Sequence, residues 1–348
     1  MSAITTTAFG VHQSEDCKSG IDMLAACGGS FDIEKVQVSY PWEDKQGVPS
    51  GMDSEGNPFY APKWNAVACH VPVRSDTGEA VADKTVGDDY TVLQNREVID
   101  IVDAICGDHD LNYDFMTTIH GGRGLAVQVK CPDLTDALSI GNDVVEGRLT
   151  ITNFHDGTGS LKVFISLLRM MCANKLPAIG REYRKAKKAG KLGTYAIKHS
   201  KNMEDRIRDM VMCYKQSMGD MVSTSELLLS MANKRITAAA RQAFFTALVN
   251  ADGKDEGELT KRAKTMRQNK MESLQSASRM SVNKVEDHQG SWYEALQAAT
   301  YFGTHEIMVR NTGRAGESEN RYVSKNFGAG ADFNKLALMT ALEMSEVA

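Results

Sequence analysis

Hydrophobic and polar residues alternate through the middle of the chain, between residues 64 and 170, as in β-strands with one buried face. Four alternating runs form two pairs, and a glycine-containing turn separates the members of each pair. Glycine adopts the positive φ that tight turns need, so Gly121-Gly122-Arg123-Gly124 and Asp156-Gly157 both favour hairpins. The predicted strands are residues 115–120, 125–130, 148–154 and 160–170.

Weaker strand patterns precede these hairpins. Residues 65–73 alternate loosely and end at a turn signal over residues 75–78, after which residues 79–92 are weakly strand-like. Asn95 then caps a predicted short helix, in which apolar residues recur at helical spacing until Gly107. Together these runs predict an antiparallel sheet of about five or six strands.

From residue 174 onward, apolar positions recur every three or four residues, which predicts helices. A basic helix is predicted over residues 173–189, interrupted near its start by Pro177, and residues 311–330 predict a loop. The other predicted helices are residues 202–233, 237–250, 258–274, 292–302 and 334–344. The fold class is therefore α+β, an antiparallel β-sheet built from hairpins and followed by a mainly helical C-terminal half.

This order divides the chain into three regions. Residues 1–60 have little periodicity and end in a turn-rich stretch, which predicts an irregular acidic N-terminal arm. Residues 61–200 form the β-hairpin sheet core with the basic helix. Residues 201–348 form a helical region that packs on the sheet.

Composition indicates a globular protein that stays in the cytoplasm. The 348 residues are 42% hydrophobic and 24% charged, which is enough apolar material for one large domain or two ordinary ones. The most apolar run, residues 164–173, is broken by Arg169 and is too short to span a membrane. No export signal is visible at the N-terminus. The 7 cysteines are scattered and lack a CxxC pair, so reduced thiols are expected.

Charge is distributed unevenly although the net charge is only -5. Residues 181–208 carry ten Lys or Arg against three acidic residues, and residues 261–284 carry seven against one. Residues 1–60 instead carry nine acidic residues and three lysines. Such segregation can mark a surface that binds polyanions.

Several ordered motifs resemble one known family. Residues 152–160 read TNFHDGTGS and residues 168–176 read LRMMCANKL, and the resemblance extends over roughly residues 64–340. Similar sequences define a phage- and plasmid-encoded family named after domain of unknown function 932. The matching motif residues are Asn153, His155, Asp156, Gly157, Cys172 and Asn174.

The resemblance implies a mobile-element protein found among genes of DNA replication and recombination. It assigns no activity to any residue. Lys175 stands where family members usually carry threonine, and Lys198 stands where arginine is common.

Cations in the basic segment occur at nearly every helical angle, with tyrosines between them. Single-strand binders combine a cationic track for phosphates with aromatic faces on which bases stack. The alternative is a solvated helix whose lysines only maintain solubility. The predicted nucleic-acid-binding residues are Tyr183, Arg184, Lys185, Lys187, Lys188, Lys191, Tyr195, Lys198, His199, Lys201 and Arg206, together with Arg123 and Arg169 on the sheet.

Two of the motif positions have alternative interpretations. Arg169 lies in an otherwise apolar strand, where it needs a carboxylate or backbone partner if buried, or suits a phosphate if exposed. Asn174 is a natural N-cap for the basic helix, although its amide is also able to bond a ligand.

His155 and Asp156 form a second candidate site. A neighbouring His and carboxylate can help to bind a divalent metal, with His120, His199 or Asp143 completing the set. Adjacent strand residues point to opposite faces, however, and Asp-Gly at a hairpin centre has a purely conformational explanation.

We therefore expect a nucleic-acid-binding accessory protein that binds single-stranded DNA and promotes strand annealing, as phage annealing proteins do. A non-enzymatic role is favoured, without an assigned catalytic residue, metal or cofactor. The expected partners are single-stranded DNA and further copies of the chain. The alternatives are a metal-dependent nuclease or hydrolase at His155 and Asp156, and a host-defence antagonist that acts through its acidic arm.

Overall fold

The computed structural model describes residues 10–12, 17, 19–42, 49–81, 84–109, 112–131, 138–141, 143–155, 161–177, 194–197, 203–309 and 317–347. The strands are β1 (Val11–His12), β2 (Ile33–Trp42), β3 (Gly51–Met52), β4 (Pro58–Phe59), β5 (Lys63–Arg74), β6 (Asn112–Ile119), β7 (Gly124–Cys131), β8 (Val145–Phe154), β9 (Leu161–Arg169), β10 (Lys175–Pro177) and β11 (Thr194–Ile197). The α-helices are α1 (Gly20–Ala26), α2 (Asn95–His109), α5 (Met203–Ala232), α6 (Ala238–Val249), α7 (Lys261–Arg279), α8 (Trp292–Tyr301), α9 (Glu317–Phe327) and α10 (Ala329–Val347).

A seven-stranded antiparallel sheet forms the centre of the molecule. Its order is β1-β6-β7-β8-β9-β10, and β11 also pairs with β9. The hairpins β6–β7 and β8–β9 confirm the two pairs of alternating runs in the sequence. The fold class is α+β, as predicted, because the helices of the second half follow the sheet in sequence.

The two faces of this sheet differ in polarity. Along β9, Leu161, Val163, Ile165 and Leu167 are buried, and the residues between them are half-buried. The first set joins the main hydrophobic core, which also contains Val127 of β7. The other face carries polar side chains from β7, β8, β9 and β10, and we call it the polar face. Its polar residues include Gln128, Lys130, Glu146, Arg148, Thr150, Thr152, Ser166 and Lys175.

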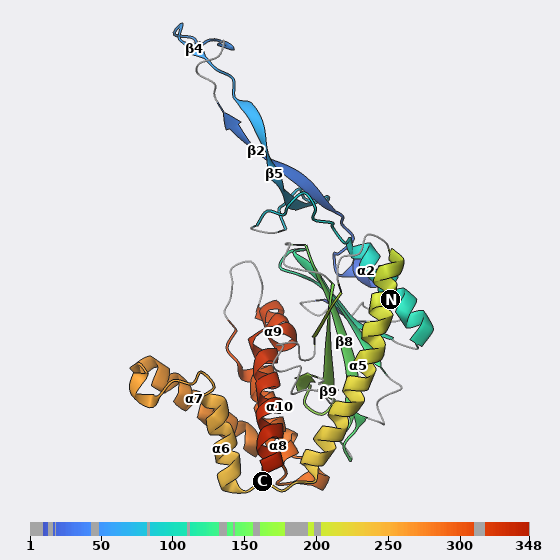
Figure 1. Ribbon diagram of the computed structural model, residues 1–348, viewed down its shortest axis with the longest axis vertical. Helices are drawn as coiled ribbons and strands as arrows, with labels where there is room; N and C mark the ends of the chain where they lie inside the picture. Colours follow the sequence, from blue (N-terminus) through green and yellow to red (C-terminus); the bar gives the residue numbers. More distant parts are fainter. Residues whose placement is uncertain are drawn as a thin grey trace, which may run out of the picture.

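Helices α1, α2 and α5 pack on the apolar face (Figure 1). Helix α5 lies so close to β8 that a Cβ at Gly147 would be 2.7 Å from the Met221 sulfur. On α2, Val98, Ile99, Ile101 and Val102 are fully buried, at the helical spacing that the sequence predicts. Helix α2 begins at Asn95 and thus confirms the predicted start.

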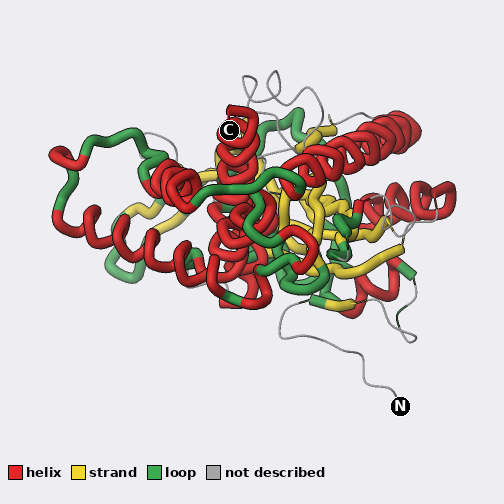
Figure 2. Tube along the Cα trace, turned by 90° about the horizontal axis from the view of Figure 1, so that it is seen from below, coloured by secondary structure: helices red, strands yellow, loops and turns green. Residues whose placement is uncertain are grey.

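The C-terminal helices α8 and α10 contribute to the same core, and Figure 2 marks the C-terminal end of α10. Trp292 and Tyr293 of α8 are fully buried, and α10 packs along β10. Helix α9 lies on the opposite side of the sheet from α5, where its Tyr322 packs with Phe115 and Ala126 of the polar face (Figure 1). Among the described residues, none of the helices is long and apolar enough to cross a bilayer.

Part of the predicted irregular arm is regular. Strand β2 pairs with β5 from Ile33–Arg74 to Trp42–Lys63, so the 60/61 boundary falls within a ribbon. The ribbon projects from the body (Figure 1) and exposes Tyr40, Trp42 and Trp64. A register shift near Gln37 and the proline at position 41 weaken the alternation of β2, which explains why the sequence pattern missed it.

Three further expectations differ from the structure. Where the structure describes residues 79–92, namely 79–81 and 84–92, strand pairing is limited to isolated bridges at Ala80 and Val86. Residues 175–177 are strand β10, so the predicted basic helix does not begin there, and Pro177 fits a short strand at the sheet margin. The predicted loop over 311–330 contains α9 and the start of α10. Its glycines, Gly328 and Gly330, lie at the junction of these two helices, where the backbones approach closely.

Candidate anion-binding site on the polar face

Three adjoining hollows lie along the polar face. The first has a volume of about 90 Å³, the second about 320 Å³ and the third about 450 Å³. Lys175 and Lys325 line both the first and the second, and His12 and Asp114 line both the second and the third. Shared walls place the three hollows in a row, which we call the polar-face hollows.

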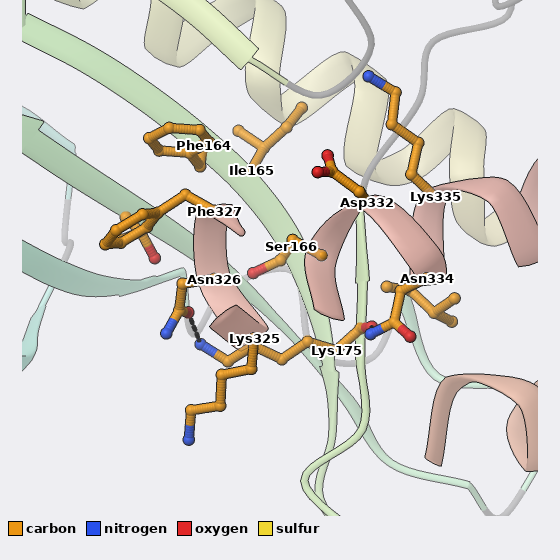
Figure 3. A pocket seen from close by; sticks show the side chains of 13 residues that line it. Phe164, Ile165, Ser166, Lys175, Lys325, Asn326, Phe327, Asp332, Asn334 and Lys335 are labelled. Carbon is orange, nitrogen blue, oxygen red and sulfur yellow. Dashed lines mark hydrogen bonds between the residues drawn. The ribbon is translucent and has the colours of Figure 1, made fainter. Parts of the chain in front are cut away.

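The first hollow lies between the sheet and the junction of α9 with α10 (Figure 3). Phe164, Ser166 and Lys175 come from the sheet, whereas Lys325 and Lys335 come from the two helices. Figure 3 shows the Lys175 ammonium directed towards Asn326, with Lys325 beside it and Lys335 at the other end of the hollow. The row therefore begins with three lysines from three different elements.

Lys175 is the most deeply buried of these lysines, with 7% of its surface exposed. Its ammonium donates to Gln128 Oε1 at 3.0 Å and to Asn326 Oδ1 at 2.5 Å. Burial, with repulsion from Lys325 and Arg148, lowers the pKa of Lys175 to about 7, although Asp114 acts in the opposite direction. Near neutral pH this side chain therefore exists in both charged and neutral forms.

Burial also lowers the pKa values of the other two lysines, Lys325 and Lys335. Burial and the nearby Arg321 lower the pKa of Lys325, and burial lowers that of Lys335 although Asp332 opposes the shift. Within the described part of the chain, no ion pair joins Lys175 or Lys325 to a carboxylate. An anion in these hollows would compensate charges that the fold has removed from water.

Asp114 is the acidic centre of the second and third hollows. Its carboxylate lies 3.3 Å from Lys130 Nζ and 3.3 Å from Arg148 Nε, and it accepts a hydrogen bond from Gln128 Nε2 at 2.6 Å. Arg148 is 3% exposed and also pairs with Glu146 at 2.5 Å. Asp114 thus contacts side chains from β7 and β8 and only partly offsets the charge of Lys175.

Aromatic rings alternate with these cations along the row. Phe164 packs on Phe327 with ring centroids 5.5 Å apart beside the first hollow. Phe115 and Tyr322 line the second hollow and pack at 5.1 Å. The ring of Tyr113 lies in the main core instead, where its hydroxyl donates to Asp103 at 2.7 Å. Phe164 and Phe327 are only half-buried, so part of each ring faces the hollow.

Arg169 was predicted either to contact phosphate from an exposed position or to be buried with a partner. The structure shows the second arrangement, in which Arg169 is buried and paired with Asp143. Its Nε donates to both carboxylate oxygens of Asp143, at 2.6 and 2.7 Å, and Nη1 donates to the Val282 carbonyl at 2.7 Å. It lies on the apolar face because β9 alternates and position 169 shares the side of Leu167. The guanidinium is therefore occupied inside the protein and turned away from the polar-face hollows.

The first two family-motif residues connect the sheet to α2. Asn153 Nδ2 donates to the Leu93 carbonyl at 2.8 Å, and His155 Nε2 lies 2.9 Å from Asn95 Oδ1. Asn95 Nδ2 in turn donates to the carbonyl of Gly29 at 3.0 Å. His155 is fully buried, so its contacts are those of a structural link at the helix start. Asp156 and Gly157 lie outside the described residues.

Cys172 and Asn174 connect the sheet to the C-terminal helices. Asn174 Nδ2 donates to the Gln297 carbonyl at 3.0 Å, and it precedes a strand rather than capping a helix. The Cys172 carbonyl lies 2.8 Å from His305 Nε2, and the Cys172 sulfur lies 3.5 Å from Arg169 Nη1. Burial raises the pKa of the Cys172 thiol.

Most of the predicted cationic track lies outside the described residues: Tyr183, Arg184, Lys185, Lys187, Lys188, Lys191, Lys198, His199 and Lys201. Tyr195 is in β11 and Arg206 is in α5. For these two residues the structure describes the backbone and not the side chain. Arg123 is half-buried in the β6–β7 turn, where its carbonyl accepts a hydrogen bond from the His155 amide at 2.9 Å.

The expected metal set is not assembled in the part of the chain that the structure describes. No group of three His, Cys, Asp or Glu side chains there is placed to hold an ion. Asp143 is bonded to Arg169, and His120 lies 3.7 Å from Glu319. His155 is buried beside Asn95.

The polar-face hollows were not predicted, although the sequence contains one signal for them. In β8, Glu146, Arg148, Thr150 and Thr152 occupy every second position, which predicts a polar second face on an otherwise apolar strand. Lys175 was recognised only as a departure from the family motif. Lys325 was not predicted because residues 311–330 read as loop, and Lys335 lies in a predicted helix whose position against the sheet the sequence does not show.

These observations define an α+β protein with an antiparallel sheet and a cation-lined polar face. The family described as Domain of unknown function (DUF932) matches residues 83–325, and the chain belongs to that family. No curated protein and no solved structure shows significant similarity to the chain. The matched range contains most of the polar face together with Lys325, but not the ribbon of β2 and β5.

Proposed function

We propose that this protein is a nucleic-acid-binding accessory protein that binds single-stranded DNA along the polar-face hollows. The observation that carries the proposal is the row itself, in which lysines and aromatic rings succeed one another across three connected cavities. Lys335, Lys325, Lys175 and Lys130 supply the positive charges in that order.

Single-stranded nucleic acid suits such a surface. Its phosphates are continuous and its bases are free to stack, so a binder needs cations at intervals with accessible rings between them. Each base stacked on an aromatic side chain contributes about 1–3 kcal/mol. Duplex DNA is a poorer match because its bases are paired and stacked on one another, so they are not free to stack on protein side chains.

The position of the basic segment supports the same proposal. The chain leaves the sheet after Pro177, which pairs with Ser166, and returns at Thr194, which pairs with Phe164. Both partners on β9 line the first hollow. The predicted cationic track is therefore attached at both ends beside the row of lysines, and its charges would add to the same field.

Strand annealing and assembly into oligomers belong to the same proposal. A protein that holds phosphates and leaves base edges unread can bring complementary strands together without sequence preference. The family resemblance to mobile-element proteins supports a role in phage or plasmid recombination or replication.

A salt-titrated binding experiment tests the proposal. Fluorescence anisotropy of a labelled oligothymidylate is measured with the wild type, with Lys130→Gln, with Lys335→Gln and with the double variant Lys187→Gln/Lys188→Gln. Each variant that removes a phosphate contact should weaken binding and reduce the salt slope by about 0.7 per contact. Lys215→Gln, at an exposed position on α5, is the matched control and should leave both quantities unchanged.

Two outcomes would contradict the proposal. If the wild type shows no salt-dependent affinity for single strands, the protein does not bind nucleic acid in this way. If affinity is present but both polar-face variants behave like Lys215→Gln, binding occurs elsewhere on the molecule.

A further inference from the structure

Lys175 and Lys325 are the only lysines in the described structure that line both the first and the second hollow. Lys175 comes from β10 and Lys325 from α9, and repulsion from Lys325 contributes to the lowered pKa of Lys175. Two positive charges, one from the sheet and one from α9, thus lie close together. Bringing them together costs free energy that a bound anion would recover.

Two acidic side chains lie near this site. Asp332 lines the first hollow and acts on the pKa of Lys335, whereas Asp114 acts on that of Lys175. Asp114 contacts Lys130, Arg148 and Gln128, and its influence on Lys175 is smaller than the combined effects of burial, Lys325 and Arg148. Lys175 instead donates to two amide oxygens, which hold its ammonium in place without cancelling its charge. Asn326 is itself held, because its Nδ2 donates to the Tyr322 carbonyl at 2.7 Å.

The size of the first hollow limits what can enter it. Its volume of about 90 Å³ is the smallest of the three hollows, and a single water needs only about 10–15 Å³ on this measure. Of the three hollows, the first is therefore the best matched to a small ion such as a tetrahedral oxyanion. Thr150 and Ser166 also line this hollow and bring hydroxyl groups that can donate to such an ion.

We propose that Lys175 and Lys325 form a binding site for a single phosphate group at the junction of the first two hollows. The ammonium groups would bind its oxygens from the sheet and from α9. The hydroxyl groups of Thr150 and Ser166 complete the donor set on the sheet side. Identifying this group as a backbone phosphate of a bound strand rests on the proposed function, whereas the oxyanion site itself does not.

Two variants test the site. Lys325→Gln changes a half-buried side chain on α9 and should fold, and Lys175→Met replaces a buried cation by an apolar chain of similar length. Binding of inorganic phosphate is measured by calorimetry, and binding of an oligothymidylate by anisotropy. Lys215→Gln serves again as the control. Circular dichroism establishes that each variant is folded before its affinity is compared.

The wild type should bind inorganic phosphate, and each site variant should lose at least about tenfold in affinity, because a charge-assisted hydrogen bond is removed. The same variants should weaken oligothymidylate binding.

Equal phosphate affinity in the wild type and Lys325→Gln would overturn the site, as would failure of the wild type to bind phosphate. Phosphate binding without oligothymidylate binding would preserve the site and overturn the proposed function. If both variants lose phosphate binding but retain oligothymidylate binding, the phosphate at this site is not a backbone phosphate of the bound strand.

Discussion

Arg169 and Asp143 form a buried ion pair that joins the last long strand of the sheet to the helical half of the molecule. Both side chains are at most 3% exposed. Tyr293 of α8 donates from its hydroxyl to Asp143 Oδ2 at 2.8 Å, and Arg169 donates to carbonyls at Val282 and Lys284. The pair therefore positions the helices that follow the sheet.

Removing one partner of this pair should destabilise the protein strongly. Arg169→Met leaves a buried carboxylate without its cation, and we expect a loss of about 3–5 kcal/mol in the free energy of unfolding. Urea denaturation followed by circular dichroism measures this loss. Arg208→Gln breaks an exposed pair with Asp205 and should cost less than about 1 kcal/mol. Equal effects of the two variants would contradict a structural role for Arg169.

The motif residues at the end of β8 should matter for stability in the same way. Asn153→Ala removes the donor to the Leu93 carbonyl, and we expect a loss of about 1–3 kcal/mol. Amide hydrogen exchange should show the loss of protection concentrated in α2, because Asn153 and His155 hold the segment that precedes and starts it. Asn57→Ala, in an exposed turn, is the control. Unchanged protection of α2 would mean that this link is unimportant.

Lys175 should make stability depend on pH. Its pKa is lowered from 10.5 to about 7 in the folded protein, so between these values the unfolded chain binds more protons. Stability should therefore rise with pH from about 7 towards 10, by up to about 1.4 kcal/mol per pH unit from this residue. Lys175→Met should lack this contribution. Denaturation at a series of pH values gives the two slopes, and identical slopes would contradict the lowered pKa.

Anion binding should show the opposite pH dependence. Sulfate stays doubly charged across this range, so any change in its affinity reports on the protein. Because only charged Lys175 attracts an anion, sulfate should bind more tightly as pH falls from about 8 to 6. Calorimetric titration of wild type and Lys175→Met measures this. A wild-type affinity that is independent of pH would show that Lys175 does not contact the anion.

Tryptophan fluorescence should distinguish the ribbon from the body. Trp42 and Trp64 are 60% and 69% exposed on β2 and β5, whereas Trp292 is 1% exposed in the core. Iodide should therefore quench two of the three tryptophans and leave a blue-shifted residual emission from Trp292. Trp292→Phe should remove that residual emission. Strong protection of Trp42 and Trp64 in the isolated protein would show that the ribbon packs against another surface.

The sequence predicted the elements whose patterns are local. Hairpins with glycine turns, such as Gly121–Gly124, and helices with regular apolar spacing, such as α2 and α5, follow from neighbouring residues alone. Strand β2 was missed because its partner β5 lies more than twenty residues away and a register shift disturbs its alternation. Helix α9 was missed because its flanking glycines read as turn signals.

The candidate site was harder to predict because it depends on pairings distant in sequence. Lys175 and Asn326 are separated by 151 positions and meet only because α9 lies across the polar face. The pairing of Arg169 with Asp143 was missed for the same reason, and Asp143 was considered only as a metal ligand. A single apolar strand with one arginine does not show which face that arginine occupies until its strand partners are known.

Photochemical crosslinking tests most directly whether a strand lies along the polar-face hollows. An oligonucleotide that carries 5-iodouracil is bound, irradiated and digested with protease, and the attached peptides are identified by mass spectrometry. We predict attachment to peptides that contain Phe164, Tyr322 or Phe327, and loss of that attachment in Lys325→Gln. Attachment confined to the ribbon of β2 and β5, or to α6 and α7, would contradict it.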